Sequence, residues 1–328
     1  MTAPVRATGA IRQQRLAVPL AVSHTVVTEV AVISLRVEHG DVHGTGEVAV
    51  GPWTTEPAET VRGGAVAVAG SAPAPATVDD VAGMLAREPL AGRGPTTRML
   101  VEMALLDLLA RRAALPLWRL LGLPQPEPYR VFRTLSVGAA PDPADTGPIK
   151  VKLGGPRDVE VLRRLAQDPD RPVIVDVNRG WSRADWTAVR DPLRRVRLQA
   201  LEDPVADPGL LPEVRSALPG VPVLLDEGIR TAAQAVAALD RADGANVKLA
   251  KMGGLLAAGE ALSRVRDAGG RRMLGCFVEP PDTIAYAAQV AGLADWTDLD
   301  GHLLLTGDPV PDRLRLDTER PGRPVFHP

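Results

Sequence analysis

Several features that mark secreted, membrane-bound or nucleic-acid-binding proteins are scarce or absent in this sequence. One cysteine, Cys276, occurs in 328 residues, so no disulfide can form within the chain, and the N-terminus lacks a secretory signal pattern. The longest uncharged stretch, residues 63–78, is too short and too weakly apolar to cross a bilayer. A net charge of −2 without a basic stripe gives no basis for binding nucleic acid or an anionic membrane. We therefore expect a cytoplasmic protein.

Lysine is also scarce. The 38 basic residues comprise 34 arginines and only four lysines, which are Lys150, Lys152, Lys248 and Lys251. Arginine can serve wherever a surface cation is needed, whereas a base that must lose its proton requires lysine. Because the four lysines form two tight clusters, they indicate a catalytic site.

The remaining composition is typical of a globular protein. Hydrophobic residues make up 45% of the chain and charged residues 24%, and the length is sufficient for one large core or two smaller ones. With nucleic acid and membranes excluded, the expected partner is a small-molecule substrate. The sequence leaves open whether the chain forms a homo-oligomer.

The first 125 residues predict an α+β domain. Residues 10–50 alternate between apolar and polar positions and are rich in β-branched residues, which predicts a small antiparallel sheet. Apolar residues then recur at helical spacing in three segments, residues 57–69, 78–88 and 96–121. Gly122 and Pro124 form a stop signal after the last of these.

Residues 126–310 predict a (β/α) barrel, so the fold class is α/β. Eight short apolar runs alternate with helical segments. The runs are residues 132–137, 149–153, 173–177, 198–201, 223–225, 245–249, 272–276 and 296–299. Between residues 136 and 149 there are too few residues and too many prolines for a normal helix, so we expect the first barrel helix to be missing or degenerate.

Three predicted strands end in a carboxylate, from Asp176, Glu202 and Asp226. Each of these acids alone could be a helix N-cap or a solvated strand end. They are spaced 24 to 26 residues apart, about one strand-plus-helix unit, so they should meet at the face where barrel enzymes carry out their chemistry. Three oxygen ligands without Cys or His suit Mg²⁺, and Mn²⁺ would also fit.

The lysines predict acid/base chemistry beside that metal. Lys150 and Lys152 alternate along one strand, so both point to one face, where mutual repulsion should lower the pKa of each and help Lys152 act as a base. Lys248 ends the sixth strand, across the barrel from the second. One base on each side of a carbon is what racemisation or epimerisation requires. Lys251, one helical turn further on, is expected to give structural or electrostatic support.

These motifs together resemble the muconate-lactonizing-enzyme subgroup of the enolase superfamily. The motifs are Lys150-Val-Lys152, Asp176-Val-Asn178, Glu202-Asp-Pro204, Asp226-Glu227 and Asn246-Val-Lys248-Leu-Ala-Lys251-Met-Gly-Gly254. The resemblance implies a modified TIM barrel whose α+β capping domain is completed by the C-terminal segment, residues 311–328. It also implies that the three acids bind Mg²⁺ and that Lys152 and Lys248 exchange protons with a metal-stabilised enediolate.

The segment Asp298-Leu-Asp300-Gly301 resembles the Asp-x-Asp feature of dipeptide epimerases, which binds the α-ammonium group of the dipeptide. Further substrate-binding candidates by this resemblance are Thr134, Ser136, Lys251 and His24. In members that act on Ala-Glu, an arginine of the capping loop meets the glutamate side chain, whereas this chain has Ser23 and His24 in that region. A dipeptide without an acidic second side chain is therefore expected.

Three alternatives remain at this point. The chain could be another member of the subgroup, namely an N-succinylamino acid racemase, an o-succinylbenzoate synthase or a cycloisomerase, none of which needs an ammonium-binding pair. It could be a Schiff-base aldolase that uses Lys248 and no metal. It could also be a barrel that binds a ligand without turning it over, although none of the expected catalytic groups is missing.

Overall fold

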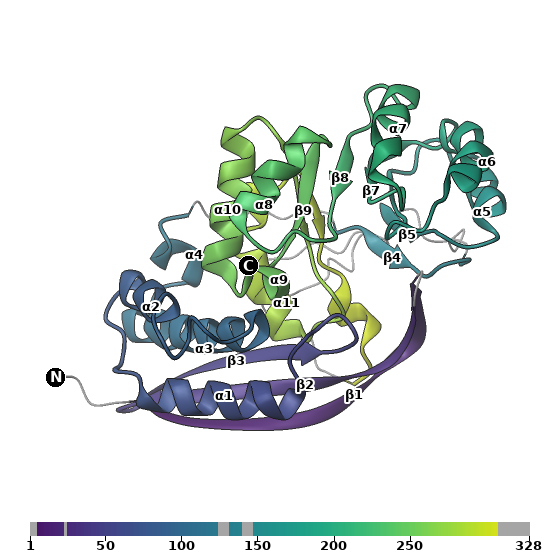
Figure 1. Ribbon diagram of the computed structural model, residues 1–328. Helices are drawn as coiled ribbons and strands as arrows, with labels where there is room; N and C mark the ends of the chain where they lie inside the picture. The colour runs from purple at the N-terminus through teal and green to yellow at the C-terminus, as the bar shows by residue number, and fades with distance from the viewer. Residues whose placement is uncertain (1–4, 23–24, 124–130, 140–146, 308–328) are drawn as a thin grey trace.

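The computed structural model describes residues 5–22, 25–123, 131–139 and 147–307, which form a capping part and a barrel part (Figure 1). We call residues 5–123 the cap and residues 131–307 the barrel. Ser23, His24, the predicted domain boundary near residue 125 and the segment 311–328 lie outside the described residues. No helix in the described ranges is long and apolar enough to span a membrane.

The cap contains the predicted antiparallel sheet, with strand order β1-β2-β3. Its strands are β1 (Arg6–Val22), β2 (Thr25–His39) and β3 (Val42–Val50). The register of β1 against β2 shifts between Arg15 and Leu20, a span that contains Pro19, which has no N–H for the ladder. The far end of this hairpin bends toward the barrel in Figure 1, and there Val137 N donates to Ala21 O at 3.1 Å.

The cap helices are α1 (Ala58–Ser71), α2 (Val78–Leu85), α3 (Pro95–Ala113) and α4 (Leu117–Leu120). Helix α3 packs directly on β3, because a Cβ at Gly44 would lie only 2.2 Å from Ala104 O. The prediction of one helix over residues 96–121 is wrong. The helix stops at Ala113, because Ala114 adopts a left-handed conformation with φ 51° and Pro116 disfavours helical backbone at the residue before it.

The barrel strands form one parallel sheet in the order β11-β10-β9-β8-β7-β6-β5-β4. They are β4 (Arg133–Leu135), β5 (Ile149–Lys152), β6 (Val173–Asp176), β7 (Leu198–Glu202), β8 (Val223–Leu225), β9 (Gly244–Lys248), β10 (Arg271–Gly275) and β11 (Trp296–Asp298). A parallel bridge between Val131 and Thr297 brings the two edges together. Every predicted apolar run contains or overlaps one of these strands, so the barrel prediction is confirmed.

Helices surround most of the barrel. They are α5 (Asp158–Leu165), α6 (Arg183–Leu193), α7 (Leu211–Ala217), α8 (Ala232–Ala237), α9 (Leu249–Met252), α10 (Leu255–Asp267) and α11 (Pro281–Ala288), with short 3₁₀ turns at Pro208–Leu210, Ala238–Asp240, Ala291–Leu293 and Gly301–Leu304. Between β4 and β5, residues 136–139 and 147–148 contain no helix, and residues 140–146 lie outside the described part. The missing first barrel helix therefore stays a prediction for residues 140–146.

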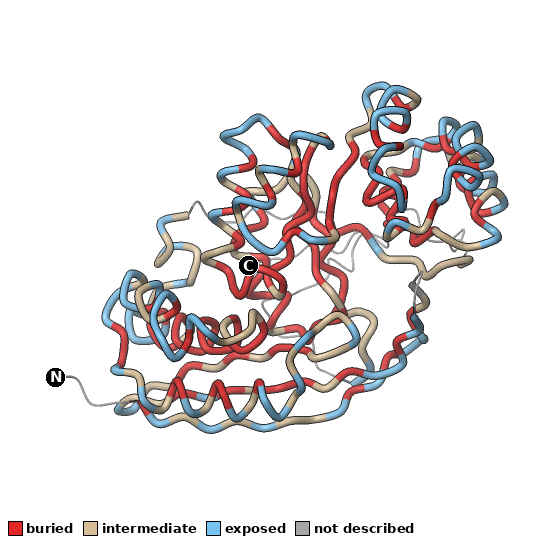
Figure 2. Tube along the Cα trace, viewed as in Figure 1, coloured by how far each residue is buried: buried red, intermediate tan, exposed pale blue. Residues whose placement is uncertain are grey.

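The cap and the barrel share one hydrophobic core, which Figure 2 shows as continuous buried chain from α3 into the barrel. At this junction the buried carboxylate of Glu102, on α3, accepts hydrogen bonds from Tyr286 Oη at 2.7 Å and from the backbone N–H of Leu255 at the start of α10. Gly254, with φ 140°, makes room for this contact, because a Cβ there would lie 2.3 Å from Glu102 Oε1. Glu102 therefore fixes α10 against the cap.

The Glu102 contact predicts a pH-dependent stability. Burial raises the pKa of Glu102 to about 7, against the opposing effect of its hydrogen bonds, from an ordinary value of 4.5. The folded state therefore binds the carboxyl proton of Glu102 more tightly than the unfolded state does. The resulting stability is fully present below pH 4.5 and is lost as the pH rises through 7. Glu102→Gln keeps an acceptor oxygen and cannot ionise. As the pH rises from 4.5 to 7, we expect its free energy of unfolding to gain about 3 kcal/mol relative to that of the wild type. Urea unfolding of both proteins from pH 4.5 to 8 measures this, and parallel stability curves would contradict it.

Candidate active site

The predicted acidic residues meet at the C-terminal ends of adjacent strands. Lys152 pairs in register with Asp176, and Asp176 pairs with Glu202, so the ends of β5, β6 and β7 lie level. Asp226 directly follows β8, and Lys248 is the last residue of β9. Strands covered on both faces are normally continuously apolar, so these buried charges form an exceptional polar cluster within the barrel.

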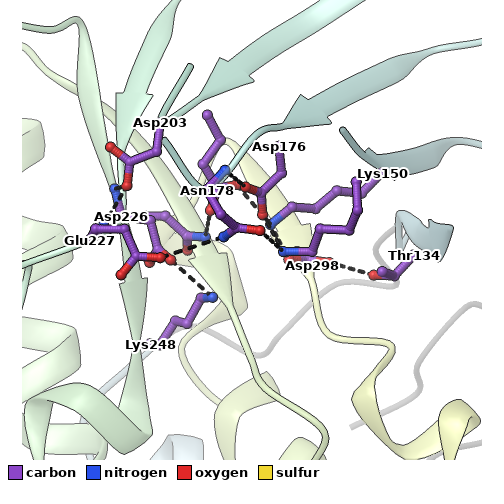
Figure 3. Close-up of polar contacts among 12 residues, drawn as sticks. Thr134, Lys150, Asp176, Asn178, Asp203, Asp226, Glu227, Lys248 and Asp298 are labelled. Atoms are coloured by element: carbon purple, nitrogen blue, oxygen red, sulfur yellow. Dashed lines mark hydrogen bonds and ion pairs between the residues drawn. The ribbon is translucent and has the colours of Figure 1, made fainter. Parts of the chain in front are cut away.

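Lys150 lies at the centre of this cluster (Figure 3). Its side chain is completely buried. Its Nζ atom lies 3.1 Å from Asp176 Oδ2, 2.7 Å from Glu202 Oε2 and 2.7 Å from Asp298 Oδ2. One ammonium group therefore joins carboxylates from β6, β7 and β11.

The other three lysines also contact the strand-end carboxylates. Lys152 Nζ donates to Asp176 Oδ2, the same oxygen that Lys150 approaches, which confirms that the two lysines point to one face. Lys248 Nζ lies 3.1 Å from Asp226 Oδ2. Lys251 Nζ donates to Asp226 Oδ1 at 2.7 Å and to the Asp226 carbonyl at 2.8 Å, which fits the supporting role expected for it.

The expected depression of the lysine pKa is wrong for Lys150. Burial disfavours its charge, but the carboxylates of Asp176, Asp298 and Glu202 outweigh burial and raise its pKa well above the ordinary value. Repulsion from Lys152 is weaker than attraction to these carboxylates, which lie within 3.1 Å of Lys150 Nζ and which the local sequence does not reveal.

The pKa values of two of these carboxylates, Asp176 and Glu202, shift in opposite directions. Burial opposes the ionisation of Asp176, yet Lys150, Lys152 and Lys248 lower its pKa. Burial and the neighbouring Asp176 raise the pKa of Glu202 to about 7.

The donor chemistry of the cluster fits a hard cation. Asp176, Glu202 and Asp226 are all buried and offer only oxygen atoms. Glu202 Oε1 accepts from Asn246 Nδ2 at 2.9 Å, and the buried Glu202 Oε2 has Lys150 Nζ as its ion-pair partner at 2.7 Å. As placed, no three Asp, Glu, His or Cys side chains within the described ranges form a metal-holding group. Instead, the lysine ammonium groups lie among the carboxylates.

The predicted ammonium-binding pair lies beside the cluster. Asp298 accepts from Lys150, and Asp300 accepts from Thr134 N at 2.5 Å and from Thr134 Oγ1 at 3.0 Å. Burial and the adjacent Asp298 raise the pKa of Asp300 to about 7. Thr134 lines the same cavity as the two aspartates, but Ser136 is not among the residues that line it.

This cavity, of about 360 Å³, lies between the cap and the mouth of the barrel. Its charged and polar wall includes Lys152, Lys248 and Lys251 together with Asn178, Asp226, Glu227, Arg230, Asp298 and Asp300. Its apolar wall includes Leu20, Val27, Trp53, Phe277, Val278 and Leu304.

Two aromatic residues of this cavity, Trp53 and Phe277, are not among the predicted site residues. Their rings stack with centroids 5.1 Å apart. The available signal was the scarcity of aromatic residues, since the chain has only five Trp and three Phe.

The position of Lys150 predicts a large effect of its removal on stability. Lys150→Met leaves the buried carboxylates without a shared counter-charge, so we expect a loss of about 3–5 kcal/mol in the free energy of unfolding. Urea unfolding in EDTA measures it. As a control, Arg164→Met breaks an exposed 2.6 Å ion pair with Glu160 and should cost far less, because solvent screens that pair. Equal losses in the two variants would contradict the central role of Lys150.

Comparisons with known proteins bear on this site. Residues 6–122 match the model of the mandelate racemase/muconate lactonizing enzyme N-terminal domain, and residues 145–317 match that of the enolase C-terminal domain-like family. The chain is 30% identical over 261 residues to a hydrophobic dipeptide epimerase from Roseobacter litoralis, which covers 71% of this chain and 74% of the relative.

Solved structures have the same architecture. An enolase family member from Agrobacterium tumefaciens with homology to dipeptide epimerases, bound to sodium and L-Ala-L-Glu, has a TM-score of 0.81 at 25% identity and covers 98% of both chains. A dipeptide epimerase from Cytophaga hutchinsonii, complexed with Mg and D-Ala-L-Val, has a TM-score of 0.79 at 23% identity over 94% of this chain and 89% of that one, which supports the fold alone. By both domain models, the chain belongs to the enolase superfamily, with a mandelate racemase/muconate lactonizing enzyme N-terminal domain and an enolase-type barrel.

Proposed function

We propose that this protein is a Mg²⁺-dependent epimerase that acts at the α-carbon of a dipeptide. The observation that carries the proposal is the placement of Lys152 and Lys248 in the wall of one cavity, from the second and sixth strands of the barrel. Two lysines on opposite sides of a bound carbon can act as a pair: one, as a neutral amine, removes a proton from one face, and the other, as an ammonium, delivers a proton to the opposite face.

In this proposal Asp176, Glu202 and Asp226 bind the metal. Their all-oxygen donor set and their burial at the ends of adjacent strands support the assignment. When bound, Mg²⁺ supplies positive charge that stabilises negative charge on the substrate carboxylate and competes with the lysines for these acids.

The proton transfer balances without a redox partner. The neutral amine of one lysine takes the α-proton and becomes an ammonium, and the C–H electron pair passes to the substrate carboxylate as an enediolate. The ammonium of the opposite lysine then donates a proton to the other face of the carbon, and the electron pair returns to form the new C–H bond. Lys150 and Lys251 orient the carboxylates around this pair, through their contacts with Asp176 and Asp226.

The cavity walls support a dipeptide with an apolar second side chain. Asp298 and Asp300 provide two buried carboxylates that can bind the dipeptide α-ammonium, with Thr134 orienting Asp300. The cap contributes Leu20, Val27 and Trp53 to the wall, and these suit an apolar group rather than a carboxylate. The similarity to the hydrophobic dipeptide epimerase of Roseobacter litoralis supports the same choice.

A Schiff-base aldolase is a weaker candidate. Such an enzyme needs no metal, so it gives no role to the buried acids Asp176, Glu202 and Asp226 at the strand ends.

Deuterium exchange tests the proposal. We expect the Mg²⁺-loaded protein, incubated with a pooled dipeptide library in D₂O, to incorporate one deuterium at one α-carbon of apolar dipeptides, as measured by mass spectrometry and NMR. EDTA should abolish the exchange. Activity that survives EDTA, together with borohydride trapping of substrate on Lys248, would establish the aldolase instead. Exchange from no dipeptide but from N-succinylamino acids would leave the proton chemistry and remove the dipeptide assignment.

The ammonium-binding pair predicts a substrate-dependent effect. Asp300→Asn should slow exchange of a dipeptide by about 100-fold, because it removes one charge of a buried ion pair with the substrate amine. Asp295→Asn is the matched control. Asp295 directly precedes β11, the strand that Asp300 follows, but it pairs with Arg272 at 3.0 Å and does not line the cavity. If Asp300→Asn keeps the wild-type dipeptide rate, Asp300 does not bind the amine.

A further inference from the structure

Phe277 contacts the lysine that ends β9. The Nζ atom of Lys248 lies over its ring, 4.5 Å from the ring centroid, and Nζ of Lys251 lies 5.8 Å from the same centroid. The face of an aromatic ring carries negative charge and attracts an ammonium group, most strongly where water is excluded. Lys248 is only 3% exposed, so this contact is largely dry.

The ring differs from a carboxylate in one respect that matters for a proton carrier. Asp226, 3.1 Å from Lys248 Nζ, attracts the ammonium but is also a proton acceptor. A π face attracts the ammonium and cannot accept its proton. Phe277 can therefore direct the lysine nitrogen without competing for the proton that the lysine takes up from one epimer and delivers to form it.

Phe277 is in turn fixed from the cap. The indole of Trp53 stacks on it, with ring centroids 5.1 Å apart and ring planes 10° apart. A tight turn sets the position of Trp53, because Thr54 N and Oγ1 both donate to Gly51 O, at 3.0 and 2.8 Å. Gly51 leaves room for the indole, since a Cβ there would lie 2.7 Å from the Trp53 ring.

We propose that Phe277 is a positioning residue for Lys248 and that Trp53 holds the Phe277 ring in place from the cap. The inference rests on the proposed function, in which Lys248 serves one face of the substrate α-carbon and Lys152 the other. It adds a role for the cap, which then orients one of the two lysines as well as walling the cavity.

The test measures exchange from the two epimers separately. Each epimer presents its α-hydrogen to one lysine, so L-Ala-L-Leu and L-Ala-D-Leu are incubated one at a time with the Mg²⁺-loaded protein in D₂O. Lys248→Ala should abolish exchange from one epimer and keep it from the other, which identifies the epimer that Lys248 serves. The same two rates are then measured for variants of Phe277 and Trp53.

We expect Phe277→Leu, which keeps an apolar side chain but removes the ring face, to slow exchange from the Lys248 epimer by about tenfold. Exchange from the other epimer should change little, and Phe277→Tyr should restore most of the lost rate. Trp53→Leu should also slow exchange from the Lys248 epimer, and Trp53→Phe, which keeps an aromatic ring, should slow it less. Leu304→Ala is the control. Leu304 is an aliphatic residue of the same cavity wall, and its substitution should change the exchange rates of both epimers by the same factor.

The outcomes separate this inference from the proposed function. Equal slowing of both epimers by Phe277→Leu, or no slowing of either, would overturn the positioning role while wild-type exchange still supports the epimerase. A wild-type protein that exchanges neither these probes nor any dipeptide of the library would overturn both. Circular dichroism and thermal unfolding of each variant check that a lost rate is not a lost fold.

Discussion

The arrangement of the barrel mouth depends on the buried ammonium of Lys150. It lies within 3.1 Å of carboxylates from three strands, those of Asp176, Glu202 and Asp298, and its own side chain has no solvent exposure. Buried carboxylates so close together repel one another, and a shared cation is the simplest means of keeping them there. The same ammonium connects the acids proposed to bind metal with the pair proposed to bind the substrate amine.

The cap and the barrel contribute different things to the cavity between them. The lysines and acids come from the ends of barrel strands, where the parallel register keeps them level. The cap contributes Leu20, Val27 and Trp53, which are apolar and belong to a hairpin and a turn. Since the two parts share one core and Glu102 ties α3 to α10, these walls have a fixed position relative to the chemistry.

Much of the fold was predictable because it depends on local patterns. Eight apolar runs of strand length became eight parallel strands, and the alternating segment before residue 50 became the antiparallel sheet. The single helix predicted over residues 96–121 failed because apolar periodicity continues through Ala114, whereas the left-handed backbone there and Pro116 end the helix. Thr134 lies within β4 and lines the cavity, whereas Ser136 directly follows β4 and does not. The position at which a strand ends does not determine the direction of the loop that follows it.

The sequence by itself determined which groups the site would contain. The scarcity of lysine and the even spacing of acids at strand ends were enough to select the catalytic candidates, because a parallel barrel brings all its strand ends to one face. Only the tertiary structure decided which charge lies beside which. Lys150 shows the consequence, since its pKa rises where repulsion within Lys150-Val-Lys152 alone would lower it. Coulombic and aromatic interactions depend on distance in space and not along the chain, and positions as far apart in the chain as Trp53, Lys248 and Phe277 become neighbours only on folding.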